Sequence, residues 1–596
     1  MSLPRGDAAI WQTSASPSPH CRNTLKKFGR DLSKIIETDV IIIGAGPVGL
    51  LAAADLSARG IKSVVIEQRS FLEAPNVKCN HVSARTMERF RRLGFVAKVR
   101  NAGLPEDHPH DIAFRTTMTG KEIARIPIPS RGERYTSTLG PDTSWATPEP
   151  PHRINQKYLE PILMGHVAEL PGVMLLNDTT YQRYVQGPDG VEAAIVDNDG
   201  GRERTVRGRF LIGADGGRSA VRKQMGAKLS GDPVLQHVQS TCIRASELGA
   251  AMEAGRAWGY YTFNPRRNGH VYAIDGEETF LVHNYLKQDE VASGGVDREW
   301  AIRTILGVDE SFEYEVVSKE DWIARRLVSD KFREGNVFIS GDACHLWVPY
   351  AGYGMNAGIA DVLNLTWLLG AHLSGWADYG ILDAYEAERL PITEQVSKFA
   401  MSHLRKISQA DVPAEIEDDT VEGQEARARL GEAAYELNVQ QFAAAGLNFG
   451  YSYADSPIIS YDGEQAPEYS MGAYTPSTVP GCRAPHFWLS EDVSLYDEIG
   501  PYYTLISLGE ADAGIVDFLT NAAELTVPIK LLEVDPSVVP SEYNHRYVLI
   551  REDQHVVWRG HTAPQDGHGL TEMLRGLTVR SSSADADSPK SELLPA

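Results

Sequence analysis

The stretch that most limits how this chain can fold is Glu37–Arg69, with the sequence ETDVIIIGAGPVGLLAAADLSARGIKSVVIEQR. Its apolar run Val40–Ile43 predicts a buried strand, the glycines of GAGPVG follow at GxGxxG spacing, and the Ala- and Leu-rich residues after them predict a helix. A second strand, Lys62–Ile66, ends directly before Glu67. This order of strand, glycine turn, helix, strand and acid predicts a dinucleotide-binding βαβ unit in an α/β fold.

Each part of this unit has a physical role if a dinucleotide binds. Gly44 permits the tight turn, Gly46 lets the backbone approach a pyrophosphate, and Gly49 lets the helix pack on the strand. The start of the helix presents N–H groups to the phosphates, and the Glu67 carboxylate accepts hydrogen bonds from the adenosine ribose. A glycine-rich turn without a ligand is the alternative interpretation, and this unit alone does not separate NAD from FAD. The residues expected at the cofactor are Gly44, Gly46, Pro47, Gly49, Glu67 and Gln68.

The composition is that of a globular chain with an acidic balance. The 596 residues are 42% hydrophobic, which suffices for several buried cores, and the formal net charge is −22. That charge argues against nucleic acid or an anionic membrane as a partner. The five cysteines are scattered without CxxC spacing, so we expect neither disulfides nor a metal site, and a reducing cytoplasm fits best. No apolar run approaches the ~20 residues of a membrane span, and residues 1–36 form a tail without a signal-peptide core.

Two later turns carry side chains that suit the binding of a ligand with hydroxyl groups and phosphates. In RGRFLIGADGGRSAVR an apolar strand leads into Asp215 and Gly216, and in NVFISGDACH a strand leads into Asp342. Carboxylates at such strand ends are placed to bind sugar hydroxyl groups. An isolated DG pair is an ordinary turn, so the weight of this interpretation comes from the presence of both segments.

The segment YAGYGMN, which follows Asp342, predicts a helix N-terminus rich in backbone N–H groups. Its partial positive charge stabilises anionic character in an adjoining ring, such as the N1 and C2=O edge of reduced flavin. A glycine-rich loop that only starts a core helix is the alternative. The residues concerned are Gly352, Gly354, Met355 and Asn356.

Other parts of the chain supply candidate contacts to the cofactor and to an aromatic ligand. Lys78 and Arg85, around the start of a predicted helix, are placed to meet a cofactor that lies across the first βαβ unit, and Gln156 begins a later helix. Residues 240–320 alternate as strands and turns of an antiparallel sheet with aromatic residues on one face. Such a sheet roofs an aromatic pocket, and its candidate residues are Tyr260, Tyr261 and His283, for which core packing is the alternative.

With these segments in order, the sequence resembles the class A flavoprotein aromatic hydroxylases, and in particular their phenol and chlorophenol hydroxylase branch. The motifs GAGPVG, GADGGRSAVR, GDACHLWVPYAGYGMNAGIADVLNLTWLL and LDAYEAERLP carry this resemblance over about residues 37–400. It implies that NADPH or NADH reduces bound FAD and that O2 then gives a flavin C4a-hydroperoxide. The distal oxygen passes to a phenolic substrate ortho or para to its hydroxyl group.

The resemblance also implies a domain plan and a homodimer or higher homo-oligomer. Thioredoxin chemistry needs a CxxC pair, and the C-terminal part has only Cys482, so we expect that part to pack or dimerise without redox activity. The expected parts are a tail (1–36), a Rossmann-type FAD-binding domain (37–400) with an inserted antiparallel substrate sheet (about 105–150 and 240–325), a helical linker (401–465), a thioredoxin-like α/β domain (466–580) and a second tail (581–596).

By position, the resemblance assigns residues to FAD and to the substrate phenol. Phenol-type relatives place an Asp or His five residues before the RTME arginine, where it takes the phenol proton. Here that residue is Asn80, which cannot act as a base, so His81, with an unperturbed pKa near ~6.5, is the candidate. A histidine that only satisfies backbone groups near the flavin is the alternative. The FAD contacts are Glu67 at the adenosine ribose, Lys78 and Arg85 at the pyrophosphate, Gln156 and Asp215 along the FAD backbone, Asp342 at ribitol, and Pro349 with Gly352–Asn356 beside the isoalloxazine.

Two other functions stay open at this stage. The same fold serves halogenases and oxidases, although WGYYTFNP is the nearest string to the WxWxIP signature of flavin halogenases and does not match it. A non-catalytic flavin-binding assembly protein is the other alternative.

Overall fold

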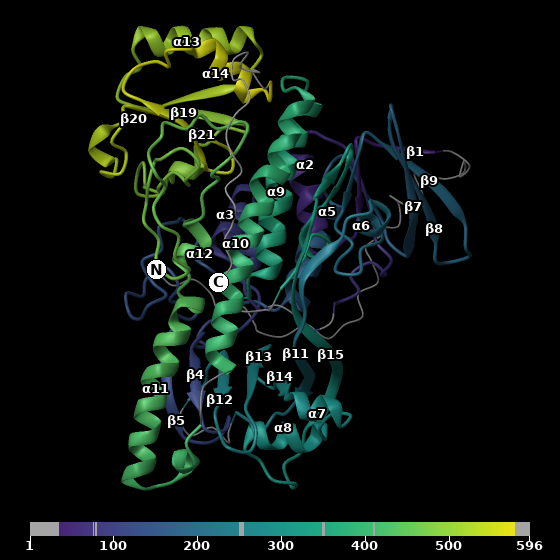
Figure 1. Cartoon of the computed structure of the whole chain (residues 1–596), viewed down its shortest axis with the longest axis vertical. Coiled ribbons are helices and arrows are strands. Elements are labelled where there is room, and N and C mark those ends of the chain that lie inside the picture. Colours follow the sequence, from purple (N-terminus) through teal and green to yellow (C-terminus); the bar gives the residue numbers. More distant parts are fainter. Residues whose placement is uncertain are drawn as a thin grey trace, which may run out of the picture.

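The computed structural model of the protein describes residues 35–75, 77, 80–249, 255–347, 352–408 and 412–577. Figure 1 shows a parallel sheet and its helices in the middle of the molecule, with a large antiparallel sheet at one end and a C-terminal sheet at the other. The α/β class predicted from the sequence is confirmed.

The central sheet consists of short apolar strands that are buried on both faces. Continuous apolar runs such as VIII in β2 (Val40–Ile43) are typical of parallel strands covered by helices on each side. The strand order is β16-β17-β10-β2-β3-β6, and every neighbouring pair is parallel except β16 with β17. The other strands are β3 (Ser63–Ile66), β6 (Val173–Leu176), β10 (Phe210–Gly213), β16 (Arg333–Glu334) and β17 (Val337–Ile339).

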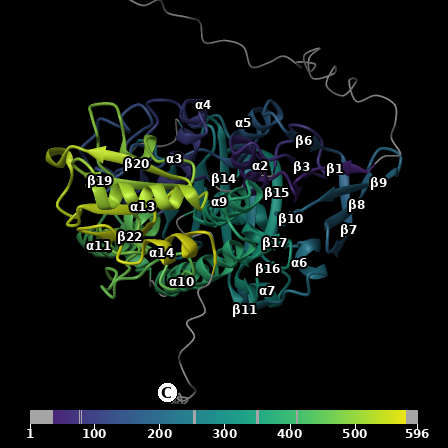
Figure 2. The same ribbon diagram turned by 90° about the horizontal axis from the view of Figure 1, so that it is seen from above.

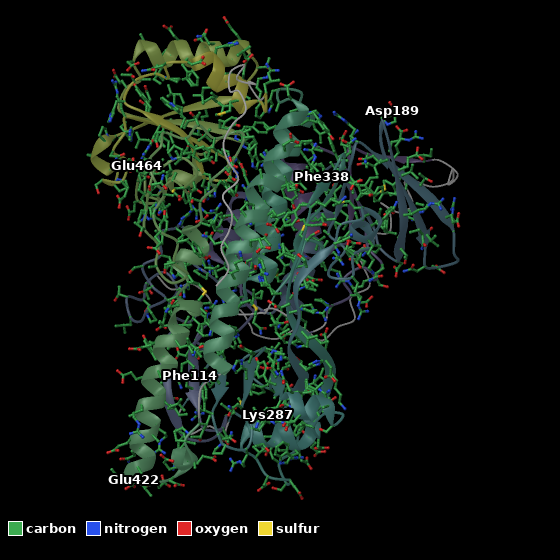
Figure 3. All side chains as sticks on the ribbon, in the orientation of Figure 1. Phe114, Asp189, Lys287, Phe338, Glu422 and Glu464 are labelled. Carbon is green, nitrogen blue, oxygen red and sulfur yellow. The ribbon has the colours of Figure 1, made fainter. Side chains whose placement is uncertain are left out.

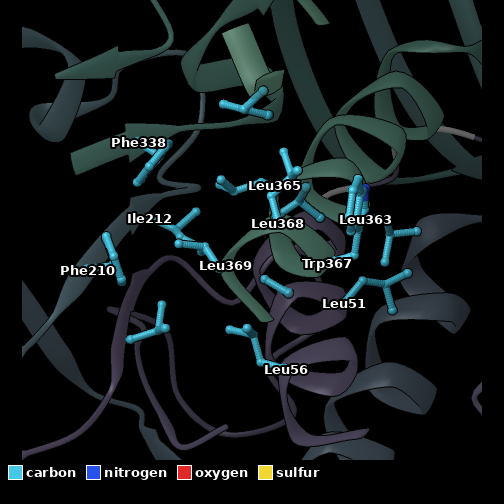
Figure 4. Packing of buried hydrophobic residues seen from close by; sticks show 14 of the residues in the cluster. Leu51, Leu56, Phe210, Ile212, Phe338, Leu363, Leu365, Trp367, Leu368 and Leu369 are labelled. Carbon is cyan, nitrogen blue, oxygen red and sulfur yellow. The ribbon is translucent and has the colours of Figure 1, made fainter. Parts of the chain in front are cut away.

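Two apolar helices, α2 (Pro47–Ala58) and α9 (Gly354–Leu373), pack on each other and on this sheet. In Figure 4, Leu51 and Leu56 of α2 lie close to leucines of α9, with Phe210, Ile212 and Phe338 contributed by the strands. The Thr366 hydroxyl of α9 donates a hydrogen bond of 2.7 Å to Asp55 of α2. Although α9 is apolar, no helix in the described ranges is long and apolar enough to cross a bilayer.

The antiparallel sheet is larger than the sequence predicted. It has the strand order β18-β15-β11-β14-β13-β12-β4-β5, and only β12 with β4 is a parallel pair. Its longest strand begins at Leu229, before the expected start near residue 240, because its pairing with β15 continues through polar and glycine residues as far as the pair Leu229 and Ser329. The strands are β4 (Ile112–Arg115), β5 (Glu122–Ile126), β11 (Leu229–Arg244), β12 (Gly259–Thr262), β13 (Gly269–Ala273), β14 (Thr279–Leu286), β15 (Glu315–Ser329) and β18 (His345–Leu346).

Helices cover this sheet. α8 (Arg298–Leu306) contacts β14, and α11 (Val421–Phe442) lies on β5 so closely that a Cβ at Gly431 would be 2.6 Å from the carbonyl oxygen of Ile123. Figure 3 shows Phe114 beside α11, whose far end carries Glu422. The apolar faces of sheet and helices form a separate core around residues such as Ile302, Ile305 and Phe442.

The remaining elements form a small sheet, a C-terminal sheet and connecting helices. The small sheet has the order β1-β9-β8-β7, and the C-terminal sheet has the order β20-β19-β21-β22. The strands are β1 (Ile36–Glu37), β7 (Thr179–Gly187), β8 (Gly190–Asp197), β9 (Glu203–Gly208), β19 (Tyr503–Leu508), β20 (Ile529–Val534), β21 (Tyr547–Arg551) and β22 (Val556–Gly560). The α-helices are α3 (Ala84–Arg92), α4 (Val96–Arg100), α5 (Gln156–Ala168), α6 (Ala220–Gln224), α7 (Gln288–Ala292), α10 (Asp383–Ser408), α12 (Ala445–Phe449), α13 (Ala513–Glu524) and α14 (Gly567–Leu574).

Buried ion pairs join the C-terminal sheet to the rest of the molecule. Glu552, which follows β21, pairs with Arg89 of α3 and lies 3.2 Å from Arg59, while Arg551 pairs with Glu388 of α10 at 2.9 Å. Figure 2 shows the C-terminal strands and α13 to one side of the central sheet. The thioredoxin-like character and the domain boundaries expected from the sequence stay predictions.

Candidate active site

The glycine turn between β2 and α2 combines two crowded positions with one open position. A Cβ at Gly44, whose φ is +104°, would lie 2.4 Å from the carbonyl oxygen of Ala214, and one at Gly49 would lie 1.9 Å from that of Gly44. A Cβ at Gly46 meets no atom of the described residues within 4 Å. Pro47 is the first residue of α2. The turn therefore leaves open space beside Gly46, at the N-terminus of α2, where an anion is favoured.

The Glu67 carboxylate holds this turn from the end of β3. It accepts hydrogen bonds from the backbone N–H of Ala45 at 2.7 Å and from that of Arg69 at 2.9 Å. Arg69 also pairs with Glu160 of α5 at 2.9 Å, and Gln156 donates to the same glutamate. The Arg69 guanidinium also donates to both oxygens of Glu67, at 3.2 Å from Nε and 3.5 Å from Nη2, so a ribose hydroxyl group has to share these acceptors with Arg69. The predicted ribose contact stays a prediction.

Gln68, next along the chain, is exposed, and its carbonyl oxygen accepts a hydrogen bond of 3.0 Å from Asn198. Its predicted cofactor contact stays a prediction.

Asp215 and Asp342 follow β10 and β17, which are adjacent parallel strands. Ligands of open α/β sheets bind beyond such carboxyl ends. One oxygen of Asp215 caps α6 through the N–H groups of Ala220 (2.7 Å) and Val221 (3.2 Å). The other oxygen, Oδ1, is buried and has no hydrogen-bond partner among the described residues. Gly216 has a φ of +76°, and Asp342 is exposed.

The start of α9 is tied to the segment before α3 by one side chain. Asn356 donates hydrogen bonds to the carbonyl oxygens of His81 (3.0 Å) and Gly352 (2.9 Å), and it accepts one from the N–H of Ser83 (2.8 Å). The Asn356 amide thus joins two chain segments. We therefore expect the backbone of this turn, and not the Asn356 side chain, to contact a cofactor. Gly354 begins α9, and Met355 packs against the central core.

The predicted base and its neighbour both have partners on the segment before α5. Arg153 donates to Nδ1 of His81, and Asn155 donates to Oδ1 of Asn80. These contacts arise because Val82 and His152 exchange two backbone hydrogen bonds of 2.9 Å.

Arg153 was missed by sequence reasoning. The only signal in the sequence is its place in PHRINQ, three residues before Gln156. Its guanidinium is buried and lies 4.8 Å from the centre of the Trp258 ring, directly before β12. It therefore links the start of α9, through His81, to the antiparallel sheet.

The three predicted substrate residues do not share one face of the sheet. Tyr261 pairs with His270, which pairs with His283, whereas Tyr260 occupies the alternate position and points to the opposite face. The Tyr260 hydroxyl accepts a hydrogen bond of 2.8 Å from the N–H of Ala257. Tyr260 thus has a packing role, because alternation in a strand sends neighbouring side chains to opposite faces.

The face that carries Tyr261 is an aromatic wall. The Tyr261 ring stacks on His270 with centroids 3.7 Å apart, and its hydroxyl lies 3.1 Å from that of Tyr272, whose ring is 5.3 Å from Trp258. Burial lowers the pKa of His283 to about 4, so this imidazole is neutral near pH 7. Its Nδ1 lies 2.6 Å from the Ser240 hydroxyl.

Two predicted cofactor residues, Lys78 and Pro349, lie outside the described residues. The structure places Arg85 at the C-terminal sheet, where it donates a hydrogen bond of 2.8 Å to the carbonyl oxygen of Asp553 and lies over the Tyr451 ring. It lines a cavity of about 430 Å³ between α3, α9 and that sheet. The predicted pyrophosphate contact of Arg85 stays a prediction.

The observed geometry fits a dinucleotide such as FAD. Open space at Gly46, a buried acceptor at Asp215 and an exposed Asp342 surround the ends of neighbouring parallel strands, and hydroxyl groups of a ligand suit both carboxylates. Fold and site together define the class of dinucleotide-binding α/β proteins.

Comparison with known proteins gives the family. Residues 37–400 match the FAD binding domain family, and residues 477–578 match the family described as aromatic-ring hydroxylase, C-terminal. An FAD-dependent monooxygenase of Emericella nidulans, apdD, is 30% identical over 87% of this chain and 87% of its own length. The phenol 2-monooxygenase of a Pseudomonas species is 28% identical over 93% of this chain and 95% of its own. A solved structure, RebC soaked with chromopyrrolic acid and with bound 7-carboxy-K252c, is 32% identical with a TM-score of 0.83, covering 91% of this chain and 100% of that one.

The chain belongs to the FAD-dependent aromatic-ring hydroxylases, and it is a flavoprotein oxidoreductase. The resemblance drawn from the sequence motifs, including the phenol and chlorophenol hydroxylase branch, is confirmed.

Proposed function

We propose that this protein is a monooxygenase that uses NADPH or NADH and O2 to hydroxylate a phenolic ring ortho or para to its hydroxyl group. When bound, FAD supplies the redox chemistry: reduced by the nicotinamide, it activates O2, so that one oxygen atom enters the ring and the other leaves as water. The observation that carries the proposal is a continuous line of contacts from Gly352 through His81 and Arg153 to Trp258 and the aromatic wall. We propose that an aromatic substrate lies between the start of α9 and that wall.

In this proposal the residues of the chain bind the cofactor and orient the substrate. The N-terminus of α2 receives the pyrophosphate beside Gly46, Asp215 and Asp342 accept hydrogen bonds from hydroxyl groups, and the start of α9 stabilises negative charge on the flavin ring edge. The cofactor roles expected from the sequence are kept as part of this proposal for Glu67, Gln68, Gln156, Lys78, Arg85 and Pro349. The dry aromatic wall excludes water from the reacting ring.

A phenolic substrate is favoured by the phenol 2-monooxygenase relative and by the polar groups at one end of the aromatic wall. Halogenase, oxidase and non-catalytic assembly roles are not favoured, since the matched families and relatives are hydroxylases and monooxygenases. We also propose a reducing, cytoplasmic location, because Cys242, Cys344 and Cys482 are buried free thiols, and a homo-oligomer as in the family expectation.

The test is oxidation of NADPH and of NADH in air by the flavin-loaded protein, with and without a panel of phenols of increasing size. The proposal expects one phenol to accelerate oxidation and to appear as a catechol or hydroquinone. Protein that binds no FAD, or that gives only peroxide with every phenol, would overturn it.

A matched pair of variants locates the substrate. Tyr261→Phe removes a hydroxyl from the aromatic wall and should change the KM for the phenol several-fold. Tyr260→Phe removes a hydroxyl on the opposite face and should leave that KM unchanged while lowering thermal stability, because the Ala257 N–H loses its partner.

A further inference from the structure

His81 is held on two opposite edges of its ring. On one edge, the buried guanidinium of Arg153 donates to Nδ1. On the other, Gly352 lies so close that a Cβ there would be 2.8 Å from the His81 Cβ and 3.7 Å from its Cδ2. The orientation of the imidazole is therefore fixed between the segment before α5 and the start of α9.

The contact with Arg153 also fixes the proton of His81. A guanidinium has five N–H donors, no acceptor and no accessible neutral form, so Nδ1 of His81 must be the acceptor. A neutral imidazole that accepts at Nδ1 carries its proton on Nε2. The arrangement thus defines one tautomer.

The charges around His81 disfavour a second proton. Protonation at Nδ1 would break the hydrogen bond and place an imidazolium beside a guanidinium and near the positive end of α9. The Arg153 guanidinium lies 3.9 Å from the Asp142 carboxylate, which is also bound by Arg134 at 3.0 Å and by the Trp145 indole at 2.7 Å. The negative charge of Asp142 is therefore neutralised mainly by Arg134, which lies closer to it than Arg153 does.

We propose that Arg153 holds His81 as a neutral imidazole protonated on Nε2, and that His81 therefore donates a hydrogen bond to the substrate oxyanion instead of taking the phenol proton. This inference rests on the proposed function. The phenol O–H bond breaks with transfer of its proton to bulk water before the aromatic wall encloses the ring, and the resulting phenolate is bound by the Nε2–H group beside the Arg153 cation. Arg153 is a positioning residue, and His81 is the donor.

The neighbouring residue agrees with this assignment. Asn80 stands where a basic side chain is expected, its amide cannot accept a proton near pH 7, and its oxygen already accepts a hydrogen bond from Asn155. A site that binds phenolate by donors and a cation needs no side-chain base at this turn.

The first test reads the tautomer directly. Nitrogen NMR of protein labelled in its histidines, with the His81 signals identified by their loss in His81→Gln, should show an unprotonated Nδ1 and a protonated Nε2 from about pH 5 to pH 8. Arg153→Met, which keeps the length but not the donors, should give a mixture of tautomers and a titration near the ordinary pKa of ~6.5. Arg153→Lys, which keeps a charged donor, should retain the wild-type tautomer.

A protonated Nδ1 in the wild type, or the same spectrum in wild type and Arg153→Met, would overturn the proposal. If Arg153→Met does not fold, the wild-type spectrum still decides the tautomer. This measurement needs no substrate, so its result stands even if no phenol is turned over and the proposed function fails.

The second test separates a donor from a base with a phenol that the wild type hydroxylates. Gln carries a donor but cannot act as a base, so His81→Gln should keep the wild-type pH profile of kcat/KM and lose much less activity than His81→Phe, for which a loss of about 10- to 100-fold is expected. If both variants lose equally and the acidic limb of the profile disappears in His81→Gln, His81 is the base and the inference is wrong.

Discussion

Gly46 and Gly49 belong to the same turn but have different surroundings. Space is open beside Gly46, whereas a Cβ at Gly49 would lie 1.9 Å from the carbonyl oxygen of Gly44. Gly46 also has an extended backbone, with φ −73° and ψ 178°, which any residue can adopt. At the residue scale, one glycine therefore serves binding and the other serves folding.

Substitution at these two positions should separate the two properties. Gly46→Val should leave the thermal midpoint of the apoprotein unchanged and weaken FAD binding by at least about tenfold, because the side chain fills the space proposed for the pyrophosphate. Gly49→Ala should lower the midpoint even without FAD, with overpacking costing about 1–3 kcal/mol. Thermal scans and fluorescence titration with FAD measure both effects. Tight FAD binding by Gly46→Val would contradict the assignment.

Asp215 gives a second prediction at this scale. Its Oδ2 caps α6, and its buried Oδ1 has no partner among the described residues, so a ligand hydroxyl group there should gain a charge-assisted hydrogen bond. Asp215→Asn keeps an acceptor for the cap but loses the charge, and FAD should bind about 10- to 100-fold more weakly. The far-ultraviolet circular dichroism of the variant serves as the folding control. Unchanged FAD affinity in a folded variant would show that Asp215 serves only the cap.

At the scale of elements, α3 joins the site to the C-terminal sheet. The N–H of Ser83, which caps α3, donates to Asn356 at the start of α9, and Arg89 near the other end of the helix pairs with Glu552. Burial alone would raise the pKa of the Glu552 carboxyl, but the guanidinium groups of Arg89, Arg59 and Arg92 hold it below its ordinary value of 4.5. The charged carboxylate therefore stabilises the docking of the C-terminal sheet against α3 and the end of α2.

The pH dependence of docking follows from this lowered pKa. Glu552 should stabilise the folded state fully above pH 4.5, and that contribution should be lost as the pH falls below this value towards the folded-state pKa. Glu552→Gln should be less stable at pH 7 by about 3–5 kcal/mol, because the buried guanidinium groups of Arg89 and Arg59 lose their shared partner. Thermal midpoints of both proteins from pH 7 to acid measure this. Equal midpoints at pH 7 would contradict it.

The elements of the site differ in how far the sequence could predict them. The turns at Gly44, Asp215 and Gly354 follow short local patterns, because a glycine at a fixed distance from an apolar strand constrains the backbone by itself. The contact between Arg153 and His81 depends on residues 80–83 lying beside residues 152–155, which no local pattern encodes. The same holds for Arg85, whose partner Asp553 lies in the C-terminal part.

For the whole molecule, the order of strands explains where the sheet that carries the substrate residues comes from. β4 and β5 leave the central domain early in the chain, β11 to β15 leave it later, and both excursions meet in one sheet through the parallel pair β4 and β12. The alternation of aromatic residues predicted that sheet, but its start at Leu229 was not predicted, since β11 begins with exposed polar residues. One end of the molecule thus provides the aromatic wall, and the central sheet provides the turns proposed to bind the dinucleotide.

We propose above that this protein transfers oxygen from O2 to a phenolic ring. The most direct measurement is mass spectrometry of the product formed under oxygen-18 gas with NADPH or NADH and a phenol that accelerates its oxidation. We expect a catechol or hydroquinone that carries one oxygen-18 atom, because one atom of O2 enters the ring and the other leaves as water. A product whose new oxygen comes from water, or labelled hydrogen peroxide with an unchanged phenol, would contradict it.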